Sequence, residues 1–338
     1  MPTPANQQSL DASHELPEDL LLTIRGFQES RAILTAIELN IFAAVGDGAT
    51  ASQVAAKLST HPRATEMLLN ALVAMGTLTK TGAIFHTTPV TAQFFGGNSP
   101  DDARAAMMHT ANLWHRWSTL TDCVRSGTSA GRQESAASGA NWTESFIAAM
   151  HRNARARAPH VVQAVGVQSV HKMLDVGGGS GAYSIAFAQA DPSLQVELLD
   201  LPDVLPIAQG HIAQAGLSNR VKTRPGDLRT DPLGQGFDLI LISAICHMLG
   251  PDENRDLLKR SHAALAPNGR IVISDFILDA GKTSPKQAAL FALNMLVGTR
   301  DGSTYSENEY AAWLREAGFQ NITRHRLPGP AHLMLATR

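Results

Sequence analysis

Cysteine is scarce in this 338-residue sequence, which holds only Cys123 and Cys246. Two cysteines exclude a disulfide framework and a cysteine-rich zinc site, and so low a number is typical of proteins in a reducing cytosol. The sequence also lacks an apolar run long enough to span a bilayer. Its polar beginning lacks the basic and apolar segments of a signal peptide. We therefore expect a cytoplasmic protein.

An excess of charge of one sign is also missing. The 28 basic and 30 acidic residues leave a formal net charge of -2, so no overall field would attract nucleic acid or anionic lipid. The hydrophobic share of 44% and the charged share of 17% are typical of a well-packed globular protein. The length suits two domains of ordinary size. We expect neither nucleic acid nor a membrane as a partner.

The first part of the chain, 1–105, has the pattern of a small helical domain. Apolar residues recur at intervals of three and four over 18–45, which indicates two helices separated near Gly26. Residues 50–75 predict two further helices, and 78–88 predict two short strands around a glycine. Two helices followed by a hairpin are typical of a winged helix.

The second part, 106–338, begins with helices and continues with alternating strands and helices. Residues 103–125 and 142–165 predict helices, so 106–165 would link the domains and roof a pocket. The short apolar strands that follow are 173–176, 196–200, 221–224, 237–242 and 270–275. Their alternation with helical stretches predicts an α/β fold with a parallel sheet covered on both faces.

A glycine-rich motif, DVGGGSG at 175–181, follows the first of these strands and precedes a helix. In this context a glycine turn brings the backbone close to a nucleotide. The spacing from Gly177 to Ala182 also fits a dinucleotide fingerprint, so NAD is an alternative. The Asp175 carboxylate would repel a pyrophosphate at the helix N-terminus but attract an ammonium group, such as that of S-adenosylmethionine (SAM). The motif therefore favours SAM.

Two further acidic residues follow later strands. Asp200 ends the second strand, where a carboxylate can accept hydrogen bonds from both ribose hydroxyls. The alternative is a helix cap for the segment that follows it. Asp227 is placed to bind the adenine amino group, with Leu228 packing on the base. Its alternative is a turn residue.

The ordered set of DVGGGSG, DLPDV and GDL, followed by a strand leading to a histidine, resembles the class I methyltransferases. More narrowly, it is similar to the small-molecule O-methyltransferases typified by the plant caffeate and animal acetylserotonin enzymes. This resemblance implies a Rossmann-like sheet, an N-terminal winged-helix dimerisation domain, SAM as cofactor and a homodimer. It implies cofactor contacts at Gly177, Asp200, Asp227, Leu228 and Ser243, to which we add Asp175, Gly179 and Leu201.

His247 is the candidate catalytic residue. It follows the strand 237–242, at the carboxyl end where open α/β sheets place their active sites. An imidazole can take a proton from a hydroxyl group near neutral pH, and the resemblance implies a catalytic base here. The alternative is a surface or capping histidine, one of 13 in the chain.

The surroundings of His247 depart from the family pattern. The family shows His-Asp-Trp where this chain has His247 followed by Met and Leu, and it places two glutamates beside the histidine. Asp275 holds the first of these positions on a shorter arm, or is a turn residue at a strand end, and Thr304 holds the second without charge. A less supported histidine is a weaker base. Either Asp301 adds support or the acceptor needs little deprotonation, which keeps S-methylation of a thiol or thioether as an alternative.

The acceptor pocket is predicted on helices. The resemblance places pocket residues at Trp114, Phe146, Met150, Asn294 and Met295, with Trp117 and Phe291 as further candidates. Their alternative is ordinary core packing. The region around His247 offers no carboxylate cluster suited to magnesium, so we expect no metal.

Two other function classes remain as alternatives. A DNA-binding regulator would need basic residues on the second helix of the winged helix, yet 62–70 holds one arginine and one acid, and the hairpin adds only Lys80. An NAD-dependent oxidoreductase would use the same glycine turn. We predict instead a SAM-dependent enzyme that methylates a hydroxyl oxygen of a small-molecule acceptor, with His247 as the general base.

Overall fold

The computed structural model describes residues 16–99, 101–130 and 140–338, with the backbone alone at 140–146, 148 and 149. The chain forms two compact units that divide after Ala111. This division falls within helix α7 (Arg104–Trp117), close to the predicted boundary at residue 105.

The N-terminal unit is helical with a small antiparallel sheet. Its helices are α1 (Glu18–Arg25), α2 (Phe27–Glu38), α3 (Ile41–Val45), α4 (Ala51–Leu58), α5 (Pro62–Ala74) and α6 (Pro89–Phe95). Its strands are β1 (Ala49–Thr50), β2 (Leu78–Thr81) and β3 (Ile84–Thr87), in the order β1-β3-β2. The predicted break near Gly26 is confirmed, and a second break occurs at Asn40, whose φ is +60°.

A single helix over 103–125 was wrong. Helix α7 ends at Trp117, and α8 (Leu120–Ser126) starts a new axis. The hydroxyls of Ser118 and Thr119 donate hydrogen bonds to backbone carbonyls three residues earlier, at 2.6 and 2.7 Å. Such side chains compete with the helical hydrogen bonds, which explains the break. The long helix α9 (Ala140–Val165) follows.

The C-terminal unit contains a seven-stranded sheet in the order β11-β12-β8-β7-β4-β5-β6. The strands are β4 (Lys172–Val176), β5 (Gln195–Asp200), β6 (Val221–Pro225), β7 (Phe237–Ser243), β8 (Leu265–Asp275), β11 (Gln320–His325) and β12 (His332–Thr337). The pairs from β6 to β8 are parallel, and β12 runs antiparallel to β8. All five predicted strands are present.

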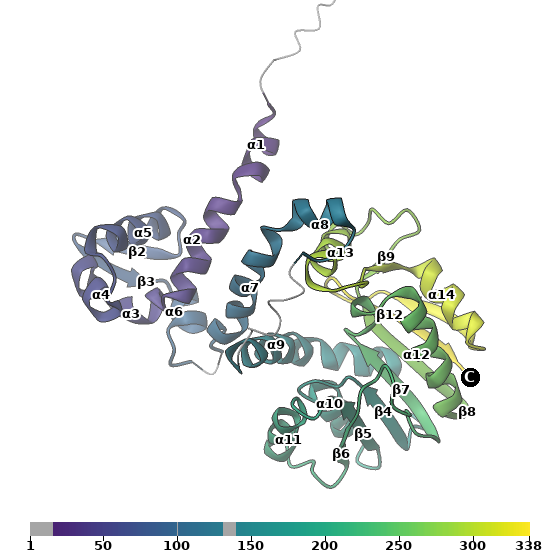
Figure 1. The fold of residues 1–338 in the computed structure, drawn as a ribbon. Helices are drawn as coiled ribbons and strands as arrows, with labels where there is room; N and C mark the ends of the chain where they lie inside the picture. The colour runs from purple at the N-terminus through teal and green to yellow at the C-terminus, as the bar shows by residue number, and fades with distance from the viewer. Residues whose placement is uncertain (1–15, 100, 131–139) are drawn as a thin grey trace, which may run out of the picture. The chain divides into compact units, whose positions relative to one another are not determined.

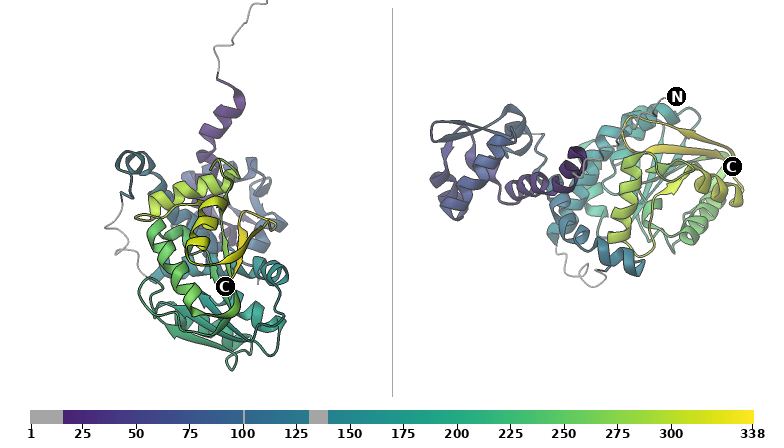
Figure 2. Two further views of the ribbon diagram at one scale, coloured as in Figure 1. Left: turned by 90° about the vertical axis from the view of Figure 1, so that its right-hand side faces the viewer. Right: turned by 90° about the horizontal axis from the view of Figure 1, so that it is seen from above.

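Helices cover both faces of this sheet, as Figures 1 and 2 show. On one face α9, α10 (Ala182–Ala190) and α11 (Leu205–Gln214) enclose one apolar core. On the other face α12 (Pro251–Ala264) and α14 (Glu307–Glu316) enclose a second. The remaining elements are α13 (Lys286–Gly298), a short 3-10 turn (Cys246–Met248), β9 (Ile277–Leu278) and β10 (Tyr305–Ser306). The predicted α/β fold with a doubly covered sheet is confirmed.

The strand order predicts where a ligand would bind to the sheet. From β4 the chain winds outward through β5 and β6, and from its other neighbour, β7, it winds the opposite way to β8. Ligands of open α/β sheets bind at the carboxyl ends of strands at such a switch point. Within the described residues, none of the helices is both long and apolar enough to cross a bilayer.

Candidate active site

The glycine turn joins β4 to α10. Gly177, Gly179 and Gly181 have φ values of +68°, +56° and +77°, in the left-handed region that glycine adopts without strain. A Cβ atom at Gly177 would lie 2.5 Å from the side chain of Ile245. Around the Cβ position of Gly179, by contrast, the described residues place no atom within 4 Å. The turn therefore leaves open space against bare backbone, as a close nucleoside ligand requires.

The Asp200 carboxylate lies at the end of β5 and binds the glycine turn. The backbone N–H of Gly179 donates to Oδ2 and that of Leu201 donates to Oδ1, both at 2.7 Å. Burial raises the pKa of Asp200, and the two N–H groups oppose that rise. Each oxygen keeps a second lone pair, so the capping role and the ribose contact are compatible. Leu201 is exposed beside it.

Asp175 lies beneath the turn. Asp175 is 1% exposed, and its carboxylate accepts a hydrogen bond from the Ser184 hydroxyl of α10 at 2.7 Å. Burial raises the pKa of Asp175 to about 6, with a further rise from the charge of Asp200. The Ser184 contact could not be predicted from the glycine motif, because Ser184 lies outside it.

The remaining predicted cofactor residues follow neighbouring strands. Oδ1 of Asp227, after β6, accepts the backbone N–H of Arg229 at 2.9 Å. The side chain of Leu228 lies 3.4 Å from the Cβ position of Gly177, so it borders the turn. Ser243 ends β7, which pairs with β4. The predicted cofactor residues thus lie at the carboxyl ends of neighbouring strands.

A histidine pair supports the same turn, and the sequence pattern did not reveal it. The rings of His151 (α9) and His211 (α11) are stacked with centroids 4.0 Å apart. His151 Nδ1 lies 2.9 Å from the Ser180 hydroxyl, and His211 Nδ1 lies 3.1 Å from the Ser180 carbonyl oxygen. Burial, followed by the charges of His211 and Arg155, lowers the pKa of His151 to about 4. Neither histidine lies in a motif, so only the packing of the two helices shows the pair.

The chain enters the His247 segment through a strained turn. Ala244 has a φ of +56°, a left-handed conformation that costs a non-glycine residue about 1–2 kcal/mol. Its N–H donates to the Ser274 carbonyl of β8 at 2.9 Å. Such strain persists where the surroundings fix the backbone, and it is concentrated at functional sites.

His247 and Asp275 form a buried pair at the ends of β7 and β8. His247 is 6% exposed and Asp275 is 1% exposed. Nδ1 of His247 lies 2.6 Å from Oδ1 of Asp275, and the His247 backbone N–H donates to Oδ2 at 3.2 Å. The Phe276 N–H and the Tyr310 hydroxyl donate to the same carboxylate, at 2.8 and 3.5 Å. Because the Nδ1–H group of His247 donates a hydrogen bond to Asp275, the free lone pair of the neutral imidazole is on Nε2.

Aromatic rings surround the imidazole. The rings of His247 and Phe291 (α13) are nearly perpendicular, with centroids 4.9 Å apart. Phe276 stacks on Phe291 at 4.0 Å. Phe276 was not among the expected site residues, although it directly follows Asp275. Thr304 is buried, and its hydroxyl has no hydrogen-bond partner among the described residues.

The predicted pocket residues come from three helices. Trp114 lies on α7, Phe146 and Met150 lie on α9, and Asn294 and Met295 lie on α13. The indole N–H of Trp117 donates to the Asn294 side-chain oxygen at 2.9 Å, which fixes this ring against α13. Met295 is buried and Met150 is half-buried. The side chain of Phe146 lies outside the described residues.

These residues fit SAM. The open side of the Gly179 turn accommodates a nucleoside against backbone, the Asp200 carboxylate has free lone pairs for hydroxyl donors, and Leu228 offers an apolar surface beside them. Groups of three or more His, Cys, Asp or Glu side chains that could hold a metal ion do not occur in the described part of the chain.

Comparison with known proteins extends this picture. Residues 117–320 match the family model of the O-methyltransferase domain, and residues 21–96 match that of the O-methyltransferase dimerisation domain. The 3-hydroxy-5-methyl-1-naphthoate 3-O-methyltransferase of Streptomyces sahachiroi is 32% identical, over 90% of each chain. The L-tyrosine C(3)-methyltransferase of Streptomyces lavendulae is 27% identical, over 95% of this chain and 93% of its own.

A solved structure is also similar along its whole length. PigF, a SAM-dependent methyl transferase of a Serratia strain, has been solved with S-adenosylhomocysteine. It superimposes with a TM-score of 0.88 at 26% identity, covering 96% of this chain and 100% of its own. The family models, the naphthoate enzyme and the shared fold agree. The chain therefore belongs to the O-methyltransferase family, whose members methylate small molecules with SAM as the methyl donor.

Proposed function

We propose that His247 is the general base that takes the proton from a hydroxyl group of the acceptor. The observation that carries this proposal is the 2.6 Å contact between Nδ1 of His247 and Asp275. It directs the free lone pair of Nε2 away from the carboxylate, and the carboxylate stabilises the imidazolium that forms. Burial of both residues keeps water from competing for these positions.

Bound SAM supplies an electrophilic methyl group, so the protein mainly has to align the acceptor and remove its proton. In this proposal Asp200 and the backbone of the glycine turn hold the nucleoside part, with Asp227 and Leu228 at the adenine. His247 receives the hydroxyl proton on Nε2 as the acceptor oxygen is methylated. The imidazolium then returns the proton to solvent after the product leaves.

We further propose that the acceptor is a flat aromatic molecule with a hydroxyl group. The stacked rings of Phe276 and Phe291 beside His247 offer an apolar, planar boundary. The name of the naphthoate relative also describes a hydroxylated aromatic acid. S-methylation of a thiol or thioether is the second candidate. Thr304 takes the position of the family's second glutamate and carries no charge to support the base, and a thiol loses its proton more easily than a hydroxyl group.

We also propose a homodimer formed through the N-terminal unit. Helix α1 has no buried residue, and Leu20, Leu22 and Ile24 are exposed on it, followed by Phe27 on α2. Exposed apolar residues gathered on one segment mark an interaction surface, and this segment overlaps the dimerisation domain at residues 21–96. Light scattering of the purified protein tests the dimer, and a Leu22→Asp variant should be monomeric.

The test of the reaction uses methyl-labelled SAM and a panel of phenols, hydroxy acids, amines, thiols and thioethers. The wild type should label an oxygen acceptor, and His247→Ala should lose activity by a factor on the order of 10³, within the range of general-base catalysis. The affinity for SAM, measured by calorimetry, should stay unchanged. Label on sulfur with little effect of His247→Ala would instead support the second candidate.

A further inference from the structure

Helix α12 contacts two loops that serve different parts of the reaction. One is the cofactor loop, residues 227–231, and the other is the histidine loop, residues 246–250. We propose that α12 is a brace that sets the position of the histidine loop relative to the cofactor loop, with Asn254 and Glu253 as positioning residues. This inference rests on the proposed roles of His247 and of Asp227 with Leu228.

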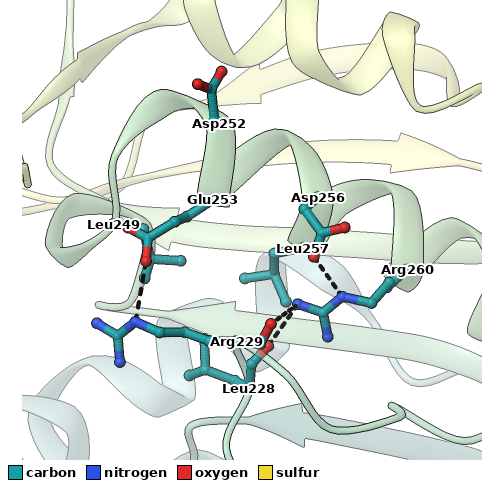
Figure 3. Close-up of a pocket in the computed structure, with 8 residues that line it drawn as sticks. All are labelled: Leu228, Arg229, Leu249, Asp252, Glu253, Asp256, Leu257 and Arg260. Carbon is teal, nitrogen blue, oxygen red and sulfur yellow. Dashed lines mark hydrogen bonds and ion pairs between the residues drawn. The ribbon is translucent and has the colours of Figure 1, made fainter.

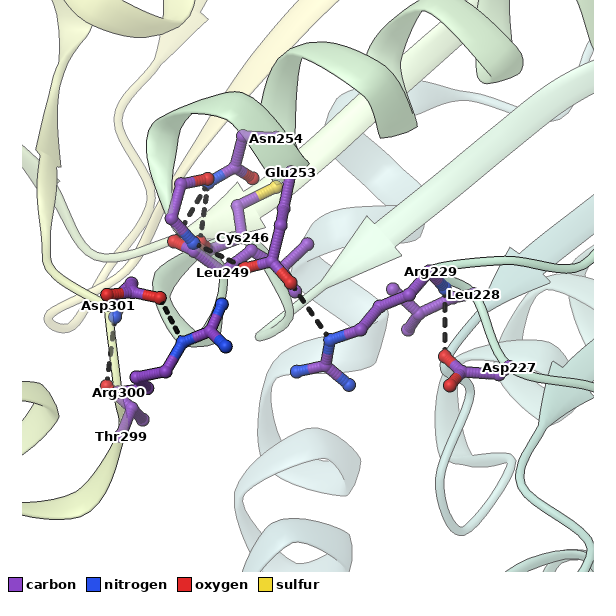
Figure 4. A network of polar contacts seen from close by, with 12 residues as sticks. Asp227, Leu228, Arg229, Cys246, Leu249, Glu253, Asn254, Thr299, Arg300 and Asp301 are labelled. Carbon is purple, nitrogen blue, oxygen red and sulfur yellow. Dashed lines mark hydrogen bonds and ion pairs between the residues drawn. The ribbon is translucent and has the colours of Figure 1, made fainter.

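Asn254 fixes the histidine loop. It is fully buried, and the two hydrogens of its Nδ2 group are shared among the carbonyl oxygens of Cys246, Leu249 and Gly250, at 2.9, 3.2 and 3.1 Å. These carbonyls lie on both sides of His247 in the chain. One amide group thus closes the loop around the base, and Figure 4 shows this cluster. The same carbonyls also accept from the Leu249 N–H, the Tyr305 hydroxyl and the Asn254 backbone N–H. The side chain of Asn254 is therefore the one group that bonds to all three, and its loss should loosen the loop without leaving a carbonyl unpaired.

Glu253 joins the two loops. Its Oε2 accepts the backbone N–H of Gly250 at 2.9 Å, and its Oε1 accepts from Nε of Arg229 at 3.2 Å. The backbone N–H of Arg229 in turn donates to the Asp227 side chain at 2.9 Å. A single carboxylate therefore connects the end of the histidine loop to the residue proposed to bind adenine (Figure 4).

Arg260 holds the other side of the cofactor loop. Its guanidinium donates to the carbonyl oxygens of Leu228 and Asp231, at 2.7 and 3.2 Å, and to the Asp256 carboxylate at 2.7 Å. This group comes from the last turns of α12, while Glu253 comes from the first turn. The cofactor loop is therefore fastened to the helix at two points, both visible in Figure 3.

Apolar packing between the helix and the loop is incomplete. A pocket of about 300 Å³ lies there, and its lining includes Leu228, Leu249 and Leu257 together with the charged residues of the two fastening points (Figure 3). Leu249 and Leu257 belong to one buried core cluster, and Leu228 packs against it, so the hydrogen bonds and ion pairs of α12 act beside this packing in setting the distance between the loops.

The brace predicts separable effects for its two residues. Asn254→Ala should lower kcat up to about 10-fold, as expected when the loop loses shared hydrogen bonds but each carbonyl keeps another donor, with little change in SAM affinity. Glu253→Gln keeps an acceptor for Gly250 but loses the ion pair with Arg229. Because that pair is partly exposed, we expect a rise of about threefold in the Kd of SAM and a similar fall in kcat.

The experiment measures the Kd of SAM without acceptor, and then kcat and KM with the acceptor that the labelling panel identifies. Glu316→Gln is the matched control, because it removes an α12 ion pair, with Arg255, that touches neither loop. Equal values for Glu253→Gln and Glu316→Gln would overturn the brace, as would an Asn254→Ala variant with wild-type kcat. If Asn254→Ala does not fold, the Glu253→Gln comparison decides alone.

The same design separates this inference from the proposed function. The Kd of SAM is also measured for Glu253→Gln combined with His247→Ala. If His247 is not the base, His247→Ala keeps its activity. In either case the brace predicts that Glu253→Gln raises the Kd of SAM in the His247→Ala variant as it does in the wild type. Loss of the effect there would count against the brace and leave the role of His247 untouched.

Discussion

The proposed cofactor end and the proposed acceptor end of the site are built in different ways. At the cofactor end, consecutive backbone groups of one turn, Gly177 to Gly181, do most of the shaping, and one carboxylate at Asp200 holds them. At the acceptor end, side chains from β8, α13 and the loop after β7 meet around His247. The first end is therefore local in sequence, whereas the second is assembled from distant segments.

The comparison predicts that the two ends fail separately, with the largest loss at the acceptor end. Asp275→Asn removes the negative charge beside His247 and replaces one accepting oxygen by an NH2 donor, so the imidazole can adopt the wrong tautomer. We expect kcat to fall roughly 10²-fold, the low end of what positioned proton transfer contributes. The Kd of SAM should remain within about twofold of the wild-type value, given that RT ln 2 is a few tenths of a kcal/mol.

A control for this variant is Asp122→Asn, which alters an exposed ion pair with Arg125 and should leave kcat unchanged. Rate and SAM affinity are measured on the same preparations. An Asp275→Asn enzyme that binds SAM much more weakly would show that the two ends are not separate.

The cofactor end should show the reverse pattern. Asp200→Ala removes a charged acceptor, and hydrogen bonds to such groups are worth enough to raise the Kd of SAM about 10-fold or more. At saturating SAM, kcat should stay close to that of the wild type. Calorimetry and saturation kinetics measure both quantities. If Asp200 is only a cap, the melting temperature will fall while the Kd stays constant.

This difference also explains what the sequence could predict. The strands, the glycine turn and the positions of Asp200 and His247 follow from local patterns. The family resemblance placed Asp275 beside His247, and the two do meet, because Asp275 ends β8 and His247 lies in the turn after its parallel neighbour β7. The break after Trp117 did not follow, because it depends on two hydroxyls that turn back on the helix.

Contacts between distant helices were beyond the sequence patterns. Asn254 looks like an ordinary polar residue of an amphipathic helix, and only the fold shows three carbonyls around its amide. The stack of Phe276 on Phe291 depends on the packing of α13, which periodicity does not specify. Ala244 gives no sign of a positive φ, since alanine has no preference for it.

A smaller effect is expected at the cofactor end, where a change at Asp175 should alter the free energy of unfolding. Asp175 has a pKa of about 6 in the folded protein against 3.8 ordinarily. Since burial raises the folded pKa, ionisation destabilises the protein progressively as the pH rises from about 4 to above 6. Asp175→Asn should therefore stabilise the protein at pH 8 by about 1 kcal/mol, after the cost of placing an amide there, or a few degrees in Tm.

The matched measurement at pH 4 should show no such gain, because the carboxyl is then largely protonated in the folded state. Thermal melts of wild type and variant across pH 4–8 give the curve. SAM affinity is measured in parallel, because the sequence predicts attraction between the Asp175 carboxylate and the ammonium group of SAM, and loss of that charge should then weaken binding. A gain independent of pH would mean that the charge of Asp175 is not the cause.

The smallest effect concerns the histidine pair at the cofactor end. Burial, with the charges of His211 and Arg155, lowers the pKa of His151 from 6.5 to about 4, so its contribution to stability is complete above pH 6.5 and is lost as the pH falls toward 4. His151→Gln keeps a partner for the Ser180 hydroxyl but does not titrate. The wild type should therefore lose more Tm than the variant between pH 7 and pH 4.5, by an amount equivalent to about 1 kcal/mol or less, because the ring is partly exposed. If the Tm of both proteins falls equally with pH, protonation of His151 does not contribute to the loss of stability in acid, and the histidine pair is only a packing contact.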